Sequence, residues 1–153
     1  VDIIDGKLDM ARDCGATHCL NSLQAPDLAV EIRKIVGAAG PDKVIETTGV
    51  RAVIEMAYEL THADGTCVLV GVPHEKVTIN TLPIHFNKIL TGSHGGQSLP
   101  HIDIPRIIRL VRARRISFDR FITHEFTLDE INAALDLARS GKAGRVLLNI
   151  SGR

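Results

Sequence analysis

The 153-residue sequence contains no tryptophan, and its aromatic fraction is only 3%. A folded core must therefore be built from aliphatic side chains, as in buried parallel sheets. Acidic and basic side chains are equal in number, 18 of each, so no net charge attracts nucleic acid or an anionic membrane. No apolar run approaches the roughly 18 residues that a membrane-spanning helix needs. These absences favour a globular protein that binds neither nucleic acid nor membrane.

Cysteine is scarce, with Cys14, Cys19 and Cys67 at irregular spacing. Three such residues do not form a disulfide framework, and their presence fits the reducing cytoplasm. The cysteines do not have the spacing of zinc ligands, and no histidine pair occurs at i, i+4 on a predicted helix. We therefore expect a cytoplasmic protein without a secretion signal, and no metal ligand within this chain.

Segments typical of strands alternate with segments typical of helices along the whole chain, which predicts a parallel sheet with helical crossovers. In the predicted helix 51–61, Val53, Ala57 and Leu60 would face inward. The expected strands are 1–4, 18–21, 43–48, 66–71, 77–79, 88–93, 121–126 and 145–150, and the other expected helices are 7–12, 26–36, 104–115 and 128–140. The sequence thus predicts an α/β fold, a Rossmann-like doubly wound parallel sheet, over residues 1–153.

Arginine is concentrated near the predicted helix 104–115. The aliphatic residues of this helix recur at core spacing and the arginines occupy the opposite face, as on an ordinary solvated helix. No aromatic residues are interleaved for base stacking. We therefore do not expect this segment to bind nucleic acid.

Ligands of open α/β sheets bind beyond the carboxyl ends of the strands, where Asp2 stands. A carboxylate after the second strand of a dinucleotide-binding fold accepts hydrogen bonds from the adenosine ribose and repels a 2′-phosphate, which favours NAD over NADP. The alternative is that Asp2 only caps the following helix. Lys7 could turn toward the same ribose, or it could be a solvated helix residue.

Gly49 and Gly71 end two successive predicted strands. Glycine at such a position lets the backbone approach a flat ligand closely. For each glycine alone, the turn from strand to helix is the better explanation. Two of them at neighbouring strand ends favour a ligand that lies across the sheet.

Several ordered motifs resemble zinc-dependent medium-chain alcohol dehydrogenases, and together they cover essentially the whole chain. They are Asp2 with Lys7, Arg12-Asp13-Cys14-Gly15-Ala16-Thr17-His18, Val44-Ile45-Glu46-Thr47-Thr48-Gly49, Leu69-Val70-Gly71-Val72-Pro73, the tail from Phe121 to Ala134, and Ser140 to Val146. The resemblance implies that NAD is the cofactor. The residues that it assigns to cofactor binding are Asp2, Ile3, Lys7, Thr48, Gly49, Val70, Gly71, Val72, Ser93 and Arg145.

By this resemblance, Asp2 would hold the adenosine ribose with help from Lys7, and Ile3 and Thr48 would flank the adenine. Val70 and Val72 would border the nicotinamide, and backbone groups of Val70 and Ser93 would lie near its carboxamide. The guanidinium of Arg145 would reach the cofactor pyrophosphate, because a planar cation suits phosphate oxygens. The segment Val77–Ser93 corresponds to the part of the family that extends the sheet across a dimer axis, so we expect a homo-oligomer formed through it.

The chain begins at Val1, without methionine and inside a predicted strand. Compared with the family, it lacks the first strand, the glycine-rich loop that holds the pyrophosphate, and the zinc-binding domain. We therefore expect a fragment truncated at the N-terminus, without catalytic residues and inactive alone, whose parent uses zinc to oxidise or reduce a small-molecule alcohol or aldehyde. Because the missing strand lies mid-sheet, the fragment alone should fold poorly or swap strands.

Three alternatives to a zinc-dependent alcohol dehydrogenase remain. A zinc-free quinone or enoyl reductase of the same superfamily usually prefers NADPH and has a small or basic residue at the position of Asp2. The presence of Asp2 therefore argues against this class. A non-catalytic dinucleotide-binding module would keep the cofactor site alone. A methyltransferase-like domain also has an acid after its second strand, but the motifs of the tail argue against this class.

Overall fold

The computed structural model describes residues 1–150. The chain divides into two compact units. The central unit comprises residues 25–99, and the terminal unit combines residues 1–24 with the chain from Pro100 onward. Each unit is described by itself.

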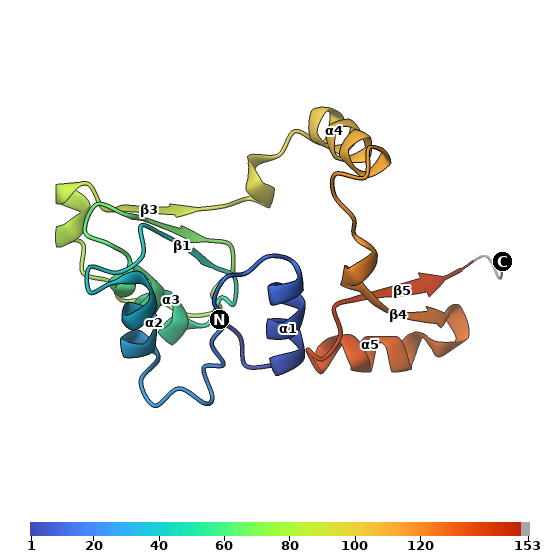
Figure 1. The fold of residues 1–153 in the computed structure, drawn as a ribbon, viewed down its shortest axis with the longest axis horizontal. Coiled ribbons are helices and arrows are strands. Elements are labelled where there is room, and N and C mark those ends of the chain that lie inside the picture. The colour runs from blue at the N-terminus through green and yellow to red at the C-terminus, as the bar shows by residue number, and fades with distance from the viewer. Residues whose placement is uncertain (151–153) are drawn as a thin grey trace. The chain divides into compact units, whose positions relative to one another are not determined.

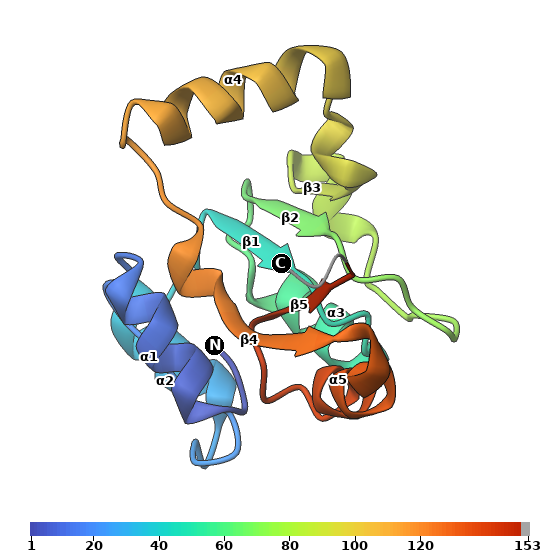
Figure 2. The same ribbon diagram turned by 90° about the vertical axis from the view of Figure 1, so that its right-hand side faces the viewer.

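The central unit is built on a three-stranded parallel sheet in the order β1-β2-β3. Figure 1 labels β1 and β3, and Figure 2 labels all three strands. The strands are β1 (Lys43–Glu46), β2 (Thr66–Leu69) and β3 (Ile89–Gly92). Helix α2 (Leu28–Val36) precedes the sheet, and α3 (Arg51–Leu60) connects β1 to β2 and contacts both strands. Two short 3-10 helices, η1 (Leu82–Phe86) and η2 (Gly95–Gln97), flank β3 in the chain.

The core of the central unit lies between α3 and the sheet. Ala57, Tyr58 and Cys67 are buried there, and Val44, Leu69, Ile79 and Leu90 pack against them. The chain's single tyrosine is accommodated because its hydroxyl donates a hydrogen bond to the carbonyl oxygen of Asn80, at 2.8 Å. A buried phenol needs such a partner. The four side chains that pack against this cluster are all aliphatic, as the composition predicts.

The expected strand at Val77–Ile79 is absent from the structure. The backbone N–H of Thr78 donates to the side chain of Glu55, at 2.8 Å from Oε1, instead of to the carbonyl oxygen of a neighbouring strand. The segment is therefore fastened to α3 by polar side chains, and Ile79 still reaches the core.

The terminal unit contains a pair of parallel strands, β4 (Ile122–Thr127) and β5 (Arg145–Asn149), connected by α5 (Ile131–Arg139) (Figure 2). The 3-10 helix η4 (Leu128–Glu130) leads into α5. A capping box starts this turn, because Glu130 Oε2 accepts hydrogen bonds from both the backbone N–H and the hydroxyl of Thr127. Such reciprocal capping satisfies backbone donors that a helix start leaves unpaired.

The same unit holds α1 (Asp5–Asp13), α4 (Pro100–Arg112) and the 3-10 helix η3 (Asp119–Phe121). The expected strands 1–4 and 18–21 are reduced to one parallel bridge, between Asp2 and Asn21. Helix α4 begins at Pro100, four residues before the predicted start, and it contains Pro105. Over residues 1–150, no helix has both the length and the apolar character that crossing a bilayer requires. The prediction of an α/β fold with parallel strands is confirmed.

Candidate functional site

Asp2 forms a parallel bridge with Asn21 and lies three residues before the start of α1. Its backbone N–H donates to the carbonyl oxygen of Leu20 at 3.1 Å, and its carbonyl oxygen accepts from Ser22 N–H at 3.0 Å. Its carboxylate accepts the backbone N–H groups of Ile3 and Ile4 at 2.7 and 3.0 Å. Both of these bonds end on Oδ1. Within residues 1–150, no hydrogen bond reaches Oδ2.

Asp2 does not cap α1, as the alternative interpretation of this residue would require. The N-cap of α1 is Ile4, and no side chain caps this position. The Asp2 carboxylate instead fixes the two amides that precede the helix. Within residues 1–150, this leaves one carboxylate oxygen without a hydrogen bond at the half-buried entrance to α1.

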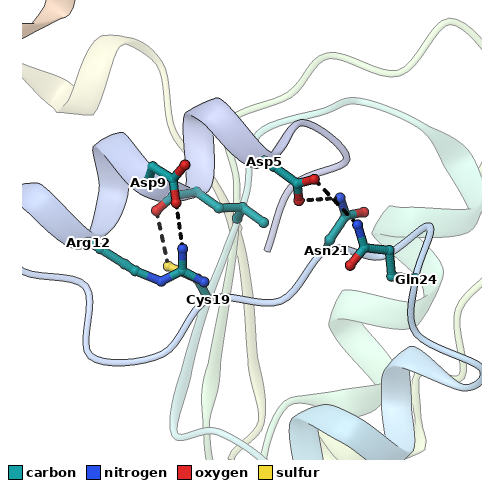
Figure 3. A network of polar contacts seen from close by, with 7 residues as sticks. Asp5, Asp9, Arg12, Cys19, Asn21 and Gln24 are labelled. Carbon is teal, nitrogen blue, oxygen red and sulfur yellow. Dashed lines mark hydrogen bonds and ion pairs between the residues drawn. The ribbon is translucent and has the colours of Figure 1, made fainter.

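Polar contacts hold α1 against the segment that follows it, as Figure 3 shows. Asp5 accepts hydrogen bonds from Asn21 Nδ2 at 2.7 Å and from Gln24 Nε2 at 3.3 Å. The Cys19 thiol donates to the carbonyl oxygen of Leu8 at 3.4 Å. Asn21 therefore joins the bridge at Asp2 to the first turn of α1 and helps to orient the Asp2 backbone.

The other predicted residues of the terminal unit lie around α1 and β5. Ile3 is exposed, and Lys7 is half-buried in the first turns of α1. Arg145 is the exposed first residue of β5, and no acidic side chain of residues 1–150 pairs with its guanidinium. The preceding Gly144 packs so closely on the Met10 side chain that an added Cβ would lie 3.4 Å from its terminal methyl carbon. The structure thus brings the start of β5 next to α1.

In the central unit, the carboxyl end of β1 is organised by Glu46, which the sequence reasoning did not select as a site residue. Its side chain is buried, with 3% of its surface exposed. Glu46 Oε1 accepts the Thr48 N–H at 2.6 Å, the Thr48 hydroxyl at 2.5 Å and the Gly49 N–H at 3.2 Å, and Oε2 accepts the same Gly49 N–H at 3.2 Å. The only signal in the sequence is an acidic residue that ends an apolar strand and is followed by small donor residues.

The backbone of Glu46 also fixes the end of β2. Its carbonyl oxygen accepts the N–H groups of Val70 and Gly71, at 2.7 and 3.1 Å. One residue therefore ties together the loops that follow β1 and β2. Thr48, Gly49, Val70 and Gly71 all belong to these loops and were all predicted to contact the cofactor.

Gly49 and Gly71 lie against each other. A Cβ on Gly71 would lie 2.0 Å from the Gly49 nitrogen, and a Cβ on Gly49 would lie 2.6 Å from the Val72 carbonyl oxygen. Gly49 also has a φ of +70°, which side chains rarely adopt. The close approach of two loops therefore explains why glycine is needed at both positions. This explanation differs from the two that the sequence suggests, a turn from strand to helix and contact with a flat ligand.

Apolar and small residues follow the strand ends. Val70 and Val72 are exposed, Val72 with 76% of its surface accessible. Ser93 comes directly after β3, and its N–H donates to the Leu69 carbonyl oxygen at 2.8 Å. Val70, Gly71 and Ser93 thus lie at the same edge of the sheet, where parallel strands place ligands.

A second polar cluster connects α3 to the segment after β2. Arg51 Nε donates to Glu55 Oε1 at 2.9 Å, and Arg51 Nη1 lies 3.8 Å from Glu75 Oε2. The hydrogen bond from Thr78 N–H, followed by that from Arg51, lowers the pKa of Glu55. The same carboxylates raise the pKa of Arg51. This cluster attaches the segment after β2 to α3 and is structural.

Three titratable side chains lie in the core behind the sheet edge. Lys88, with 6% of its surface exposed, donates from Nζ to the Tyr58 carbonyl oxygen at 2.8 Å and lies 4.7 Å from the centre of the Tyr58 ring. Burial lowers the pKa of Lys88 and raises the pKa values of Tyr58 and Cys67. Each group is thus shifted toward its uncharged form, as expected for ionisable groups in a core.

The residues described by the structure do not form a zinc site. Nowhere in residues 1–150 do three or more His, Cys, Asp or Glu side chains come together as a metal ion would require. The three cysteines are dispersed, with Cys14 exposed, Cys19 half-buried and Cys67 buried. Zinc chemistry is therefore not assigned to any residue of this part of the chain.

Comparisons with known proteins agree with the parallel α/β fold and the order of its motifs. Alcohol dehydrogenase 2 of Zea mays is 32% identical over 154 residues, which cover 98% of this chain and 40% of the maize protein. A zinc-binding-domain alcohol dehydrogenase protein of Burkholderia ambifaria superimposes with a TM-score of 0.86 at 30% identity, over 97% of this chain and 40% of that one. Benzyl alcohol dehydrogenase of Acinetobacter calcoaceticus gives a TM-score of 0.88 at 25% identity, over 98% and 41% of the two chains.

The chain spans about 40% of the length of these relatives. The family model described as zinc-binding dehydrogenase matches residues 1–113, about three quarters of the sequence. The match includes α1, the three strands of the central unit and α4. The chain therefore belongs to the zinc-binding dehydrogenase family.

Proposed function

We propose that this chain is the NAD-binding part of an oxidoreductase that transfers hydride between a small alcohol or aldehyde and the nicotinamide. The observation that carries the proposal is the Asp2 carboxylate, held before α1 with Oδ2 outside its internal hydrogen bonds. The similarity to alcohol dehydrogenases supports the reaction class. When bound, NAD would supply the hydride acceptor, and the residues of this chain would bind and orient it.

In the terminal unit, the proposed task is recognition of the adenosine ribose and the pyrophosphate. Asp2 Oδ2 can accept ribose hydroxyl groups, and its negative charge opposes a 2′-phosphate. Lys7 and Arg145 add two cations whose ammonium and guanidinium groups form no ion pair within residues 1–150. Cations of this kind suit phosphate oxygens.

In the central unit, the proposed task is to support the flat rings of the cofactor. Exposed Val70 and Val72 offer an apolar surface after β2, and Thr48 and Gly49 follow β1. Ser93 adds a backbone carbonyl group and a hydroxyl after β3. These residues occupy the sheet edge at which parallel α/β folds bind ligands.

We also propose that residues 77–93 form a self-association surface. Leu82, Phe86 and Ile89 have 60%, 68% and 51% of their surface exposed. Strand β3 is an edge strand of its sheet, so its outer edge has no strand partner within residues 1–150. Exposed apolar side chains next to an open strand edge favour pairing with a second copy.

Cofactor binding is tested by calorimetric titration of the chain with NADH and NADPH, after circular dichroism has verified that the sample is folded. We expect NADH to bind more tightly than NADPH. The Asp2→Asn variant keeps an oxygen for the Ile3 and Ile4 amides but loses the charge. It should weaken NADH binding about tenfold or more, because a hydrogen bond to a charged group contributes about 1.5–3 kcal/mol.

The matched control is Asp9→Asn, since Asp9 is an exposed carboxylate of α1, the helix that follows Asp2, and pairs with Arg12 at 2.7 Å. It should leave both affinities unchanged within about twofold, a difference of about 0.4 kcal/mol. Equal preference for NADH and NADPH in the unmodified chain, or unchanged preference in Asp2→Asn, would refute the ribose role. Tighter binding of NADPH would favour the zinc-free reductase alternative.

A further inference from the structure

The Glu46 side chain is a buried carboxylate that the proposed cofactor contacts do not use. Only 3% of its surface is exposed, and within residues 1–150 no lysine or arginine pairs with it. A buried charge without a counter-ion persists only when hydrogen-bond donors satisfy it. The donors around Glu46 therefore explain why a carboxylate is tolerated at this position.

All of these donors come from the loop that immediately follows β1. Thr48 contributes its N–H and its hydroxyl, and Gly49 contributes its N–H, which both carboxylate oxygens share. The Thr48 hydroxyl oxygen in turn accepts the Val50 N–H at 3.0 Å, directly before α3 begins. The carboxylate thus determines the course of the backbone between the end of β1 and the start of α3.

The loop after β2 depends on the same arrangement. Val70 and Gly71 donate to the Glu46 carbonyl oxygen, and Gly71 lies directly against Gly49. A shift of Gly49 would therefore press on Gly71 or open a gap beside it. Interactions with Glu46 hold one loop directly through its carboxylate and the other through its carbonyl oxygen and the Gly49–Gly71 contact.

We propose that Glu46 is a positioning residue for the cofactor. Its carboxylate does not touch the cofactor, but Glu46 holds in place the loops after β1 and β2 that support it. This inference rests on the proposed NAD-binding function. It assigns to Glu46 a role in affinity that is separate from general stability, because the hydrogen bonds of its carboxylate are confined to the loop after β1.

Glu46→Gln is the direct test, since glutamine has nearly the same shape. Its remaining carbonyl oxygen can replace Oε1, but its amide group then places a donor opposite the Gly49 N–H. We expect the dissociation constant for NADH, measured by nicotinamide fluorescence, to rise about tenfold, the effect of losing one charge-assisted hydrogen bond. The control Glu59→Gln changes an exposed glutamate of α3 and should remain within about twofold of the unmodified chain.

Amide hydrogen exchange followed by NMR separates positioning from a general loss of stability. In Glu46→Gln, exchange should accelerate at Thr48 and Gly49 but not at Cys67 and Val68 in β2. Equal acceleration at all four amides, or an unchanged NADH affinity in the folded variant, would overturn the proposal. If Glu46→Gln does not fold, Thr48→Val removes the 2.5 Å hydroxyl bond while keeping the carboxylate. Because Thr48 is itself proposed to contact the cofactor, this variant is judged by exchange alone. Exchange should accelerate at Gly49 but not at Cys67 and Val68, and unchanged exchange at Gly49 would overturn the proposal.

The failure of the proposed function gives a different result. In that case the unmodified chain itself does not bind NADH, and the cofactor role of Glu46 is overturned together with it. When the unmodified chain binds NADH and the folded Glu46→Gln variant binds it equally well, only the positioning role is overturned.

Discussion

The contact between Gly49 and Gly71 allows a sharp test of how the two strand-end loops fit together. In Gly71→Ala, the new methyl carbon would lie 2.0 Å from the Gly49 nitrogen, 2.7 Å from the Thr48 carbonyl carbon and 2.8 Å from the Gly49 Cα. All three are backbone atoms, so no side-chain rotation can relieve the overlap. The loop after β1 must move as a whole, against the bonds that Glu46 makes to it.

Two opposing effects decide the size of the change in stability. Replacing glycine by alanine restricts the unfolded chain and stabilises a protein by about 0.4–1 kcal/mol where the native backbone permits it. Overpacking costs about 1–3 kcal/mol, and more where the surroundings cannot relax. Because the overlap at Gly71 is with the backbone, we expect the second effect to prevail, with a net loss of about 1–3 kcal/mol.

Gly92 provides the matched control at the end of the neighbouring strand β3. A Cβ at Gly92 would have no atom within 4 Å, and its φ lies outside the left-handed region. Gly92→Ala should therefore stabilise the chain slightly. In urea unfolding followed by circular dichroism, Gly71→Ala should lower the midpoint by roughly 1 M, given a slope of about 1–3 kcal/mol per molar. Equal midpoints for the two variants would refute the close contact between the loops.

Two further predictions concern the core and the surface of the central unit. Because burial raises the pKa of Cys67, the unfolded chain loses the Cys67 proton above about pH 9 while the folded chain retains it. The free energy of unfolding should therefore fall between pH 8 and pH 10, and it should fall less in Cys67→Ala; an identical decrease in both proteins would contradict the assignment. Phe86→Glu should reduce self-association in sedimentation velocity experiments, whereas a substitution at exposed Leu23 should not, and an unchanged distribution of species in Phe86→Glu would exclude the surface 77–93 as the interface.

The sequence predicts those features that depend on local pattern. The spacing of Val53, Ala57 and Leu60 predicts a helix over 51–61, and the structure places α3 at Arg51–Leu60 with Ala57 and Leu60 buried. The sequence also predicts a helix that opens at Asp5, and α1 begins there, three residues after Asp2. Strands are predicted less well because pairing decides where they end. The expected strand 18–21 retains a single bridge, at Asn21.

The features that the sequence does not disclose depend on contacts between distant segments. Nothing near Lys88 in the sequence indicates that its ammonium group is buried under the Tyr58 ring, thirty residues away. The role of Gly71 follows from the register that places β2 beside β1, which only the folded chain defines. Glu46 is recognisable as an anomaly in an apolar strand, but its partners become apparent only when the loop after it is seen to fold back.

The attachment of the segment 78–88 to α3 has a mechanical consequence. The Thr78 N–H donates to Glu55, the Tyr58 hydroxyl donates to the Asn80 carbonyl oxygen, and Lys88 donates to the Tyr58 carbonyl oxygen, so three hydrogen bonds attach the segment to about one turn of a single helix. A displacement of this segment must break them or carry the helix along with it. Helix α3 begins where the loop after β1 ends. A partner that binds the segment 78–88 and displaces α3 would therefore also displace the backbone that hydrogen-bonds to Glu46.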